Sequence, residues 1–360
     1  MVRLILHRLL VIVFMTVAAA AHGQTEPGAT LSGTPPENEP NVDVEEPKPE
    51  LERPSVWGEP TKVRVAIYVV DVDEVDSAKQ RFSASLYLEA RWRIPALQHE
   101  GPGPMHRSWA KVWTPRLTIA NQQQAWRSFP ERVEIQPDGE VIYRQKMWGY
   151  FSQPLNLREF PQDRQKLTIH MVAAGLRESE VQMVSLPRED GDMSGIAEVF
   201  SLPDFDVLSW KVEPHPFTAF EGLAGTAGFQ MEIEVRRRIG YFVIKVIIPL
   251  CLIVIMSWVP RWVDPREFGA SLGISATSVL TLIAYLFAIT VFLPPVSYIT
   301  RMDRFILLAT IMVFASLLHT VLNTTLVRKE KTGLVERIDI WSRAVYPVVL
   351  ILVLVVSFGL

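Results

Sequence analysis

The sequence contains 360 residues, of which 49% are hydrophobic, and it carries a formal net charge of -3. Because there is no basic stripe with interleaved aromatic residues, this balance argues against a nucleic-acid-binding protein. The single cysteine, Cys251, rules out an internal disulfide, and the seven histidines lack the spacing of metal ligands. We therefore expect no metal site and no cofactor.

The first 23 residues have the pattern of a secretory signal peptide. Arg3 and Arg8 accompany an apolar run that ends in small residues, so cleavage is expected near Gln24. An uncleaved membrane anchor is the alternative. Residues 24–60 contain eight prolines and nine acidic residues against two basic ones, a composition that cannot bury a core. They are predicted to form a disordered leader.

Residues 61–236 change to short alternating runs separated by turns such as Pro137-Asp138-Gly139. The runs are KVRVAIYVVDV, FSASLYLEARWRI, EVIYRQKMWGYF, KLTIHMV and FQMEIEV. Many short strands in an exported segment predict an antiparallel β-sandwich. The segment shows no phosphate loop, nucleophile elbow or other catalytic constellation, so an enzyme is not expected.

Four apolar segments follow, each close to the 20 residues that a helix needs to cross the hydrocarbon of a bilayer. They cover residues 239–259, 271–293, 305–327 and 338–360. The linkers are short, so neighbouring spans must be antiparallel. The basic residues of the linkers favour neither orientation, and the signal peptide decides it. The expected fold class is an extracellular antiparallel β-sandwich followed by a four-helix transmembrane bundle, with the transmembrane domain in residues 237–360.

One face of the second span is small or hydroxylated at its inner end and apolar further out. Its residues recur at steps of four, three, four and three: Gly273, Thr277, Leu280, Ala284 and Phe287. This face could be a helix interface, where small residues let backbones approach and hydroxyls bond across. It could also be a pore wall, in which a hydrophobic constriction gates by dewetting. A pore requires an oligomer with rotational symmetry, because one helix encloses nothing.

Four segments carry a family signature in one order: WTPRLTIAN, FPQDRQKL, RRRIGYFVIKVIIP and LTLIAYLFAITVFLPPVSYIT. They resemble segments of the pentameric ligand-gated ion channels, the Cys-loop receptor superfamily. The second resembles the family's Phe-Pro-x-Asp-x-Gln loop, and in the first Arg116 replaces the usual acid. Two cysteines close that loop in animal members. The matching positions here are Gln153 and Leu167, so the bridge is absent, as in bacterial members. The match runs from about Val63 to the last residue.

The resemblance implies a homopentamer in membrane lipid, with an extracellular ligand-binding sandwich in each subunit and a pore lined by the second helix. It implies the bacterial inner membrane as the location, with the N-terminal domain on the periplasmic side. The expected function is a ligand-gated ion channel that an extracellular proton or small molecule opens. A four-span receptor or binding module that conducts no ions is the alternative. Ordinary sandwich packing is the alternative for every motif outside the membrane, and for Trp92, Trp113 and Phe160 a place in the core is the favoured interpretation.

The resemblance also places coupling elements where the sandwich meets the membrane. They are the turn with Asp76, the Phe-Pro loop, and the loop with Pro294 and Tyr298. Asp163 and Arg237 match positions whose carboxylate and guanidinium pair beneath the sandwich in relatives, and such a shielded pair is strong and geometrically specific. The alternative is that Arg236–Arg238 are exposed arginines near lipid headgroups.

The agonist of the family binds between subunits in a box of aromatic side chains, for which this sequence offers Phe217, Phe220 and Trp113. The tryptophan expected after Leu167 is missing, with Ala174 near its place, so a cation–π cage for a quaternary amine is poorly supported. A proton, a small amine, an acid and a divalent ion stay open. Acidic clusters at residues 71–76 and 189–192 could sense protons or calcium, or be solvated loops.

The gate and the ion selectivity are predicted from the second helix. Leu280 lies at the polar-to-apolar transition, where a ring of leucines would keep the closed pore dry, and Phe287 is the second candidate. The residues FGAS at the start of this helix carry no charge, and the nearest acids are Glu267 and Asp264. Residues 61–235 contain 24 acidic and 19 basic side chains, which would raise the cation concentration in a pentamer's vestibule. We therefore expect a cation-selective pore, with Glu267 as the first candidate for a charged contributor.

Overall fold

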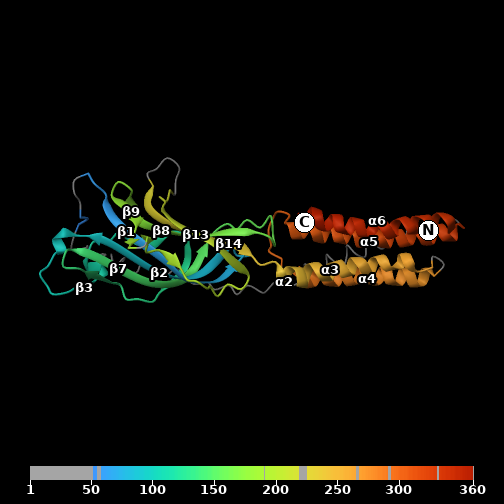
Figure 1. Ribbon diagram of the computed structural model, residues 1–360, viewed down its shortest axis with the longest axis horizontal. Helices are drawn as coiled ribbons and strands as arrows, with labels where there is room; N and C mark the ends of the chain where they lie inside the picture. The colour runs from blue at the N-terminus through green and yellow to red at the C-terminus, as the bar shows by residue number, and fades with distance from the viewer. Residues whose placement is uncertain are drawn as a thin grey trace, which may run out of the picture. The chain divides into compact units, whose positions relative to one another are not determined.

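The computed structural model describes residues 52–54, 58–189, 191–218, 225–264, 267–290, 293–330 and 332–359. The predicted signal peptide and nearly all of the predicted leader lie outside these residues, as does Phe220. All strands precede the long helices along the chain, in the order that the sequence predicts (Figure 1).

The larger of the two main sheets has eight strands. Their order is β12-β1-β2-β7-β6-β3, with β5 also paired to β7 and β9 also paired to β1. Their bounds are β1 (Thr61–Asp76), β2 (Arg81–Arg93), β3 (Met105–Ser108), β5 (Gln122–Arg127), β6 (Arg132–Ile135), β7 (Glu140–Ser152), β9 (Val181–Ser185) and β12 (Gly195–Ile196). Most pairs are antiparallel, but β9 and β12 run parallel to β1.

The smaller sheet has four antiparallel strands in the order β13-β14-β8-β4. They are β4 (Leu117–Ile119), β8 (Arg164–Arg177), β13 (Phe205–Pro214) and β14 (Thr226–Arg237), and a separate ribbon pairs β10 (Pro187–Arg188) with β11 (Gly191–Asp192). Both main sheets contribute to one hydrophobic core, Leu86 and Trp92 from β2 and Ile169 and Met231 from β8 and β14. The predicted β-sandwich is confirmed.

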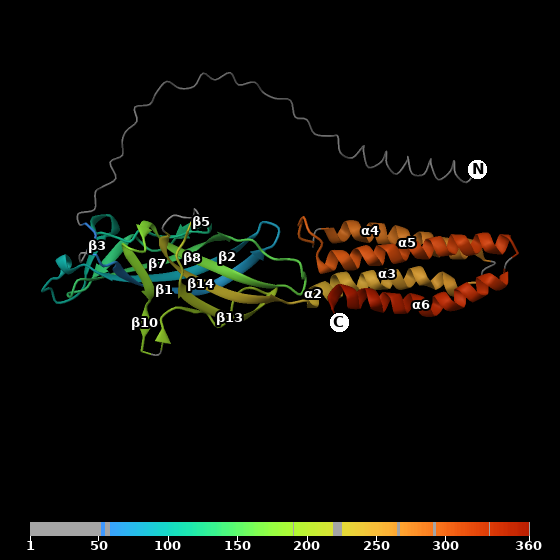
Figure 2. The ribbon, with the colours of Figure 1, turned by 90° about the horizontal axis from the view of Figure 1, so that it is seen from above.

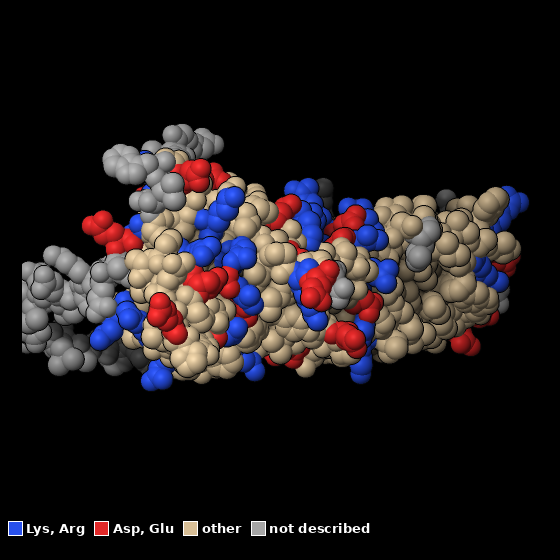
Figure 3. Space-filling view, turned by 60° about the vertical axis from the view of Figure 1, so that its left-hand side comes forward, with Lys and Arg blue, Asp and Glu red and all other residues tan. Residues whose placement is uncertain are grey.

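Four helices among the described residues are long and apolar enough to cross a membrane. The first consists of α2 (Gly240–Phe242), a π turn (Val243–Ile247), α3 (Ile248–Trp258) and a 3₁₀ turn (Val259–Trp262); the others are α4 (Phe268–Ile289), α5 (Arg301–Arg328) and α6 (Thr332–Phe358). These last three begin three to six residues before the predicted spans. The added residues of α5 and α6 include charged side chains, which an apolar window leaves out. On the face drawn in Figure 3, charged side chains gather over the strands and are sparse over the helices.

Pro249 accounts for the π turn in the first span. Proline has no N–H to donate to the carbonyl group one turn earlier, which here belongs to Lys245. The hydroxyl of Tyr285 on α4 donates to the carbonyl oxygens of Lys245, at 3.3 Å, and Val246, at 2.8 Å. The Lys245 carbonyl oxygen that the proline leaves without a donor thus accepts from α4. The long helices α3, α4, α5 and α6 run alongside one another (Figure 2).

A polar contact also joins three helical elements around Arg261, whose side chain is buried. Its Nη1 donates to the hydroxyl of Ser316 on α5 at 3.0 Å, and its guanidinium carbon lies 4.4 Å from the ring centre of Tyr346 on α6. The Nε of Arg343 donates to the carbonyl oxygen of Arg261 at 2.9 Å. Side-chain hydrogen bonds therefore add to apolar packing in holding α6 to the other helices.

Candidate coupling junction and pore-lining face

One glutamine holds the loop between β7 and β8, which contains the Phe-Pro signature. The Nε2 of Gln153 donates to the carbonyl oxygen of Lys166 at 2.7 Å, and its Oε1 accepts from the N–H of Thr168 at 2.8 Å. These backbone groups flank Leu167, which is fully buried in the core. At the two positions that the resemblance matches to the loop-closing cysteines, a carboxamide clamp and a core leucine therefore stand instead.

Asp163 and Arg237 form the ion pair that the sequence predicts. The Nε of Arg237 donates to Asp163 Oδ1 at 2.8 Å, and Nη2 donates to Oδ2 at 3.2 Å. The side chain of Arg237 is 7% exposed and that of Asp163 is 1% exposed. Gln165 also donates to Asp163 Oδ2 at 2.7 Å, so both carboxylate oxygens are engaged. Two parallel bonds between a guanidinium and a carboxylate fix the relative position of the strand end and the loop.

Arg237 also contacts neighbouring elements of the junction. Its Nη2 donates to the hydroxyl of Ser77, in the turn between β1 and β2, at 3.1 Å. Its guanidinium carbon lies 5.1 Å from the ring centre of Phe160 and 4.4 Å from that of Phe205. Arg236 and Arg238 are exposed, whereas Arg237 is buried. The alternative of three exposed arginines therefore holds for Arg236 and Arg238 but not for Arg237.

The first turn of α5 is hydrogen-bonded to the Phe-Pro loop through the backbone. The N–H of Arg301 donates to the carbonyl oxygen of Arg158 at 3.1 Å, and the N–H of Met302 donates to that of Phe160 at 3.2 Å. The next N–H, of Asp303, is capped by the side chain of Thr300. The first N–H groups of a helix have no partner within the helix. Here a loop of the sandwich supplies two of the missing acceptors.

Tyr298 lies against the same loop. Its hydroxyl accepts from the N–H of Leu157 at 2.9 Å, and the guanidinium carbon of Arg158 lies 5.7 Å from its ring centre. Arg301 adds hydrogen bonds to Gln162, at 2.8 Å, and to Glu159, at 2.5 Å. Pro294 is half-buried in the same segment, which leads from α4 to α5. The segment between these helices is thus tied to the sandwich by Tyr298 and Arg301.

Asp76 stabilises its own turn and makes no hydrogen bond or ion pair with the helices in the described part of the chain. Its Oδ1 accepts from the N–H groups of Ala78 and Lys79 at 3.1 and 3.0 Å. Burial raises the pKa of Asp76, but the hydrogen bonds and charge of Lys79 and the hydrogen bond of Ala78 outweigh it and lower the pKa below its ordinary value. Asp76 therefore shapes the turn that presents Ser77 to Arg237.

α4 has two faces with different surroundings. One face is buried against the other helices and carries Ser271, Ser275, Ser278, Leu282 and Ile289. Its hydroxyls bond within the bundle, as that of Ser275 does with the hydroxyl of Thr320 at 2.9 Å. The other face is exposed in the single chain and contains all five predicted pore residues. The most prominent are two large apolar side chains, Leu280 at 68% exposed and Phe287 at 75%.

Glu267 and Asp264 lie just before α4. Both are exposed, and Glu267 stands at the N-cap position, where its side chain makes no capping hydrogen bond. The backbone N–H of Glu267 donates to the carbonyl oxygen of Asp264 at 2.8 Å.

Two family models match this chain. The model of the neurotransmitter-gated ion-channel ligand binding domain matches residues 48–239, and that of the neurotransmitter-gated ion-channel transmembrane region matches residues 246–334. The chain belongs to the neurotransmitter-gated ion-channel family. This is a family of ligand-gated ion channels and not of enzymes, and the chain has an extracellular N-terminal domain followed by membrane-spanning helices.

Two curated relatives of this channel protein are named "Gamma-aminobutyric acid receptor subunit beta". The one from Caenorhabditis elegans is 25% identical over 278 residues, and the one from Lymnaea stagnalis is 24% identical over 289 residues. Each alignment covers 74% of this chain, but 50% and 56% of the two relatives. The channel chain thus spans about half the length of the curated relatives it matches.

Two of the residues predicted to bind the agonist, Trp113 and Phe217, lie in different surroundings. Trp113 is 7% exposed and packs edge-on against Trp92 in the core, the packing role that was the alternative for it. Phe217 is 38% exposed and lies near His170, whereas Phe220 is outside the described residues. Of the three, Phe217 alone is known to be accessible to a ligand in the channel subunit.

The acidic clusters of the channel's sandwich bind protein groups. Asp71 accepts from the N–H of Ser201 at 2.7 Å, Asp73 from the indole N–H of Trp148 at 2.7 Å, and Asp192 from the N–H of Ser194 at 2.9 Å. Among the described residues, no group of three or more His, Cys, Asp and Glu side chains could hold a metal ion. These acids serve as turn and strand supports in the structure.

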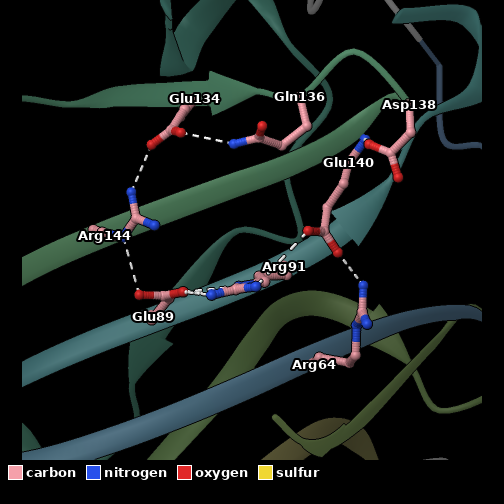
Figure 4. Close-up of polar contacts among 8 residues, drawn as sticks. All are labelled: Arg64, Glu89, Arg91, Glu134, Gln136, Asp138, Glu140 and Arg144. Carbon is pink, nitrogen blue, oxygen red and sulfur yellow. Dashed lines mark hydrogen bonds and ion pairs between the residues drawn. The ribbon is translucent and has the colours of Figure 1, made fainter. Parts of the chain in front are cut away.

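Sequence reasoning missed an ordered array of charges on the outer face of the eight-stranded sheet (Figure 4). Arg144 bridges Glu89, at 3.0 Å, and Glu134, at 2.6 Å, and Arg91 contacts Glu89 at 2.5 Å. The array continues through Glu140, which pairs with Arg64. Burial lowers the pKa of Arg144, but its bonds to the two carboxylates outweigh burial and raise it. The signal that could have found the array is the alternation of charged and apolar residues along β2 and β7.

Proposed function

We propose that this chain is the subunit of a homopentameric channel in which a ligand bound at the extracellular sandwich opens a pore lined by α4. The observation that carries the proposal is the set of contacts between the Phe-Pro loop and the segment from α4 to α5. Backbone hydrogen bonds from Arg301 and Met302 connect the sandwich to α5, and the hydroxyl of Tyr298 connects it to the segment between α4 and α5. A movement of the loop would therefore be transmitted to α4, as coupling between distant sites requires.

The exposed face of α4 supports the assembly. In a single chain it leaves Leu280 and Phe287 more than two-thirds exposed, although the opposite face is packed. In a ring of subunits around one axis this face would line the centre, with Gly273 and Thr277 toward one end and the apolar residues beyond them. Leu280 would then form the constriction that a closed pore needs to exclude water.

The proposed selectivity is for cations. The sandwich has more acidic than basic residues, 24 against 19 in residues 61–235, and five copies would repeat this negative bias around the vestibule. The carboxylate of Glu267 is exposed beside the first turn of α4. A ring of carboxylates at a pore mouth attracts cations.

The proposed ligand is a small polar molecule bound between subunits. The relatives' names make γ-aminobutyric acid, which carries one ammonium and one carboxylate, the first molecule to test. The charged array of Figure 4 has three guanidiniums and three carboxylates on one sheet face, and its charges are mutually paired. Beside such an array the ligand's ammonium could approach a carboxylate and its carboxylate a guanidinium. Neither charge of the ligand would then be buried without a partner.

Currents across lipid bilayers containing the purified full-length protein test the proposal. The panel would comprise γ-aminobutyric acid, other small amines and acids, calcium, and a range of pH. At least one of these should open a conductance, and the Leu280→Ser variant should respond at lower ligand concentration. A correctly folded protein that binds a ligand of the panel but conducts no ions, alone or with Leu280→Ser, would instead identify a binding module.

A further inference from the structure

One tyrosine lies on the packed face of α4, the helix proposed to line the pore. Tyr285 is half-buried and falls between Leu282 and Ile289 in the buried stripe of this helix, at steps of three and four residues. It therefore points away from Phe287 on the open face. Its hydroxyl donates to the backbone carbonyl oxygens of residues 245 and 246 in the first span, at 3.3 and 2.8 Å. A side chain of α4 thus completes the hydrogen bonding of another helix.

The stretch of the first span that accepts this bond is short of backbone donors. Pro249 has no N–H, so the carbonyl group of Lys245 lacks its ordinary helical partner. The residues Val243–Ile247 form a π turn, a rare form that occurs mostly as a local bulge within an α-helix. Inside a bilayer no water replaces a missing donor, and an unsatisfied carbonyl group is costly. The phenol of Tyr285 supplies the donor that the proline lacks.

The same π turn continues directly from the coupling junction. β14 ends at Arg237, the residue that pairs with Asp163, and α2 begins at Gly240 and runs into the π turn without a break. Phe242, the last residue of α2, packs edge-on against Phe160 of the Phe-Pro loop, with the ring centres 4.8 Å apart. The carbonyl groups that Tyr285 binds therefore lie just beyond the part of the first span that contacts the sandwich.

We propose that Tyr285 is a positioning residue that ties the outer half of α4 to the π turn of the first span, so that the two move as one unit. Through this bond the end of β14 acts on α4 directly, in addition to the route from the Phe-Pro loop through α5. Because Leu280 and Phe287 lie on the same stretch of helix, a shift of the π turn moves the residues of the proposed gate. Only this effect on the gate rests on the proposed function.

Backbone hydrogen exchange, followed by mass spectrometry on the full-length protein in lipid nanodiscs, tests the tie without ligand or current. Tyr285→Phe removes the hydroxyl and keeps the ring. The amides of residues 243–251 and of residues 282–289 should both exchange faster, by roughly fivefold, the factor that corresponds to one hydrogen bond of ordinary net strength. The control is Tyr68→Phe, which removes an exposed hydroxyl from β1 and should change neither segment. A wild-type rate in either segment of Tyr285→Phe would overturn the proposal.

A second background separates the hydrogen bond from the packing of the aromatic ring. Pro249→Ala introduces an N–H that can donate to the carbonyl group of Lys245, so the first span no longer depends on the phenol. When Tyr285→Phe is added to this variant, exchange of residues 243–251 should stay unchanged. Exchange of residues 282–289 should still become faster, because α4 has lost its tie. If residues 243–251 accelerated equally with and without Pro249→Ala, the hydroxyl would not be acting on these carbonyl groups and the proposal would be rejected.

The location of the change decides the question if Pro249→Ala does not fold. Faster exchange in Tyr285→Phe that is confined to residues 243–251 and 282–289 supports the tie. An equal increase in residues 305–313 of α5 would show a general loosening of the helices and would overturn it. A protein that conducts no ions would give the same exchange results, so such a failure would concern the proposed function and not the bond.

Discussion

At the scale of single residues, the coupling junction depends on two charges that are shielded from water. Removing charges from water costs several kcal/mol per ion, and pairing compensates only when the geometry is good and the remaining lone pairs are used. Asp163 meets both conditions, because Arg237 binds it at two oxygens and Gln165 adds a third hydrogen bond. The exposed carboxylate of Asp206, which contacts Arg236 at 3.7 Å and Arg238 at 2.8 Å, is a matched surface comparison.

Asp163→Asn and Arg237→Gln are each expected to impair gating while sparing ligand binding. Each should also lower the stability of the fold by about 3–5 kcal/mol, because the remaining partner is left buried and unpaired. The double variant should lose little more than either single one. Asp206→Asn serves as the control and should change stability by less than about 1 kcal/mol. Thermal unfolding and concentration–response curves measure these effects, and additive losses would contradict a single functional unit.

Leu280→Ser is expected to favour the open pore. A hydroxyl at this ring would allow water into the constriction, so the channel should open at roughly tenfold lower ligand concentration or leak without ligand, corresponding to about 1.4 kcal/mol. The control is Ile283→Ser, an exposed position that is not one of the five stripe residues. Single-channel recording distinguishes the outcomes. Wild-type gating in a normally assembled Leu280→Ser channel would move the constriction elsewhere, with Phe287 next in line.

Among the elements, loops are held in place by hydrogen bonds to backbone groups that have no partner within their own helix or strand. The first turn of α5 has N–H groups without helical partners, and the Phe-Pro loop offers carbonyl oxygens to them. The same loop is tied to β8 by the side chain of Gln153. One short loop therefore connects a strand of the sandwich to a membrane helix, without a covalent bridge.

Gln153→Ala is expected to loosen this loop. It removes two hydrogen bonds of about 1 kcal/mol each, so the free energy of unfolding should fall by about 2 kcal/mol. Gln153→Glu keeps the acceptor for Thr168 but loses the donor to Lys166, and should cost an intermediate amount. Stability would be measured by thermal unfolding of the detergent-solubilised protein. A loss in Gln153→Ala no larger than that of a surface substitution such as Gln124→Ala would show that the clamp adds no stability.

For the molecule as a whole, one face of α4 requires partners that a single chain does not supply. The packed face is satisfied by α3 and α5, whereas Leu280 and Phe287 stay exposed on the other. Closed rings of identical subunits bury such a face by repeating one contact around an axis. Native mass spectrometry of the solubilised protein should therefore give a pentamer, and a stable monomer or dimer would contradict the pore assignment.

The assembled channel is expected to prefer cations. Under a NaCl gradient the reversal potential should lie toward the sodium equilibrium potential, because the sandwich and Glu267 both contribute negative charge. Glu267→Gln should shift it toward zero, while Glu336→Gln, which removes an exposed carboxylate of α6, should not. A reversal potential near that of chloride would reject cation selectivity, and an unchanged preference in Glu267→Gln would exclude this residue alone.

Much of the fold followed from the sequence, because periodicity reports which side of an element is buried. Alternating apolar residues on β2 and β7 predicted strands, and long apolar runs predicted the four helices. The stripe of α4 was predicted as one face, but spacing alone could not separate a pore wall from a helix interface. The structure shows that the serines of α4 lie on the packed side and Thr277 on the open side, since Ser275 and Ser278 point more than a quarter of a turn away from it.

Residue patterns alone predicted an exported sandwich followed by four membrane helices. The pairing of Asp163 with Arg237 was predicted from the family resemblance. Only the tertiary structure decided which polar groups satisfy one another. The clamp of Gln153 on β8, the bonds from α5 to the Phe-Pro loop and the bond of Tyr285 with the first span join residues that lie far apart along the chain or have no signature of their own. Local pattern reports burial, but the partner of a hydrogen bond depends on which elements the whole fold brings together, so these contacts could not be read from spacing.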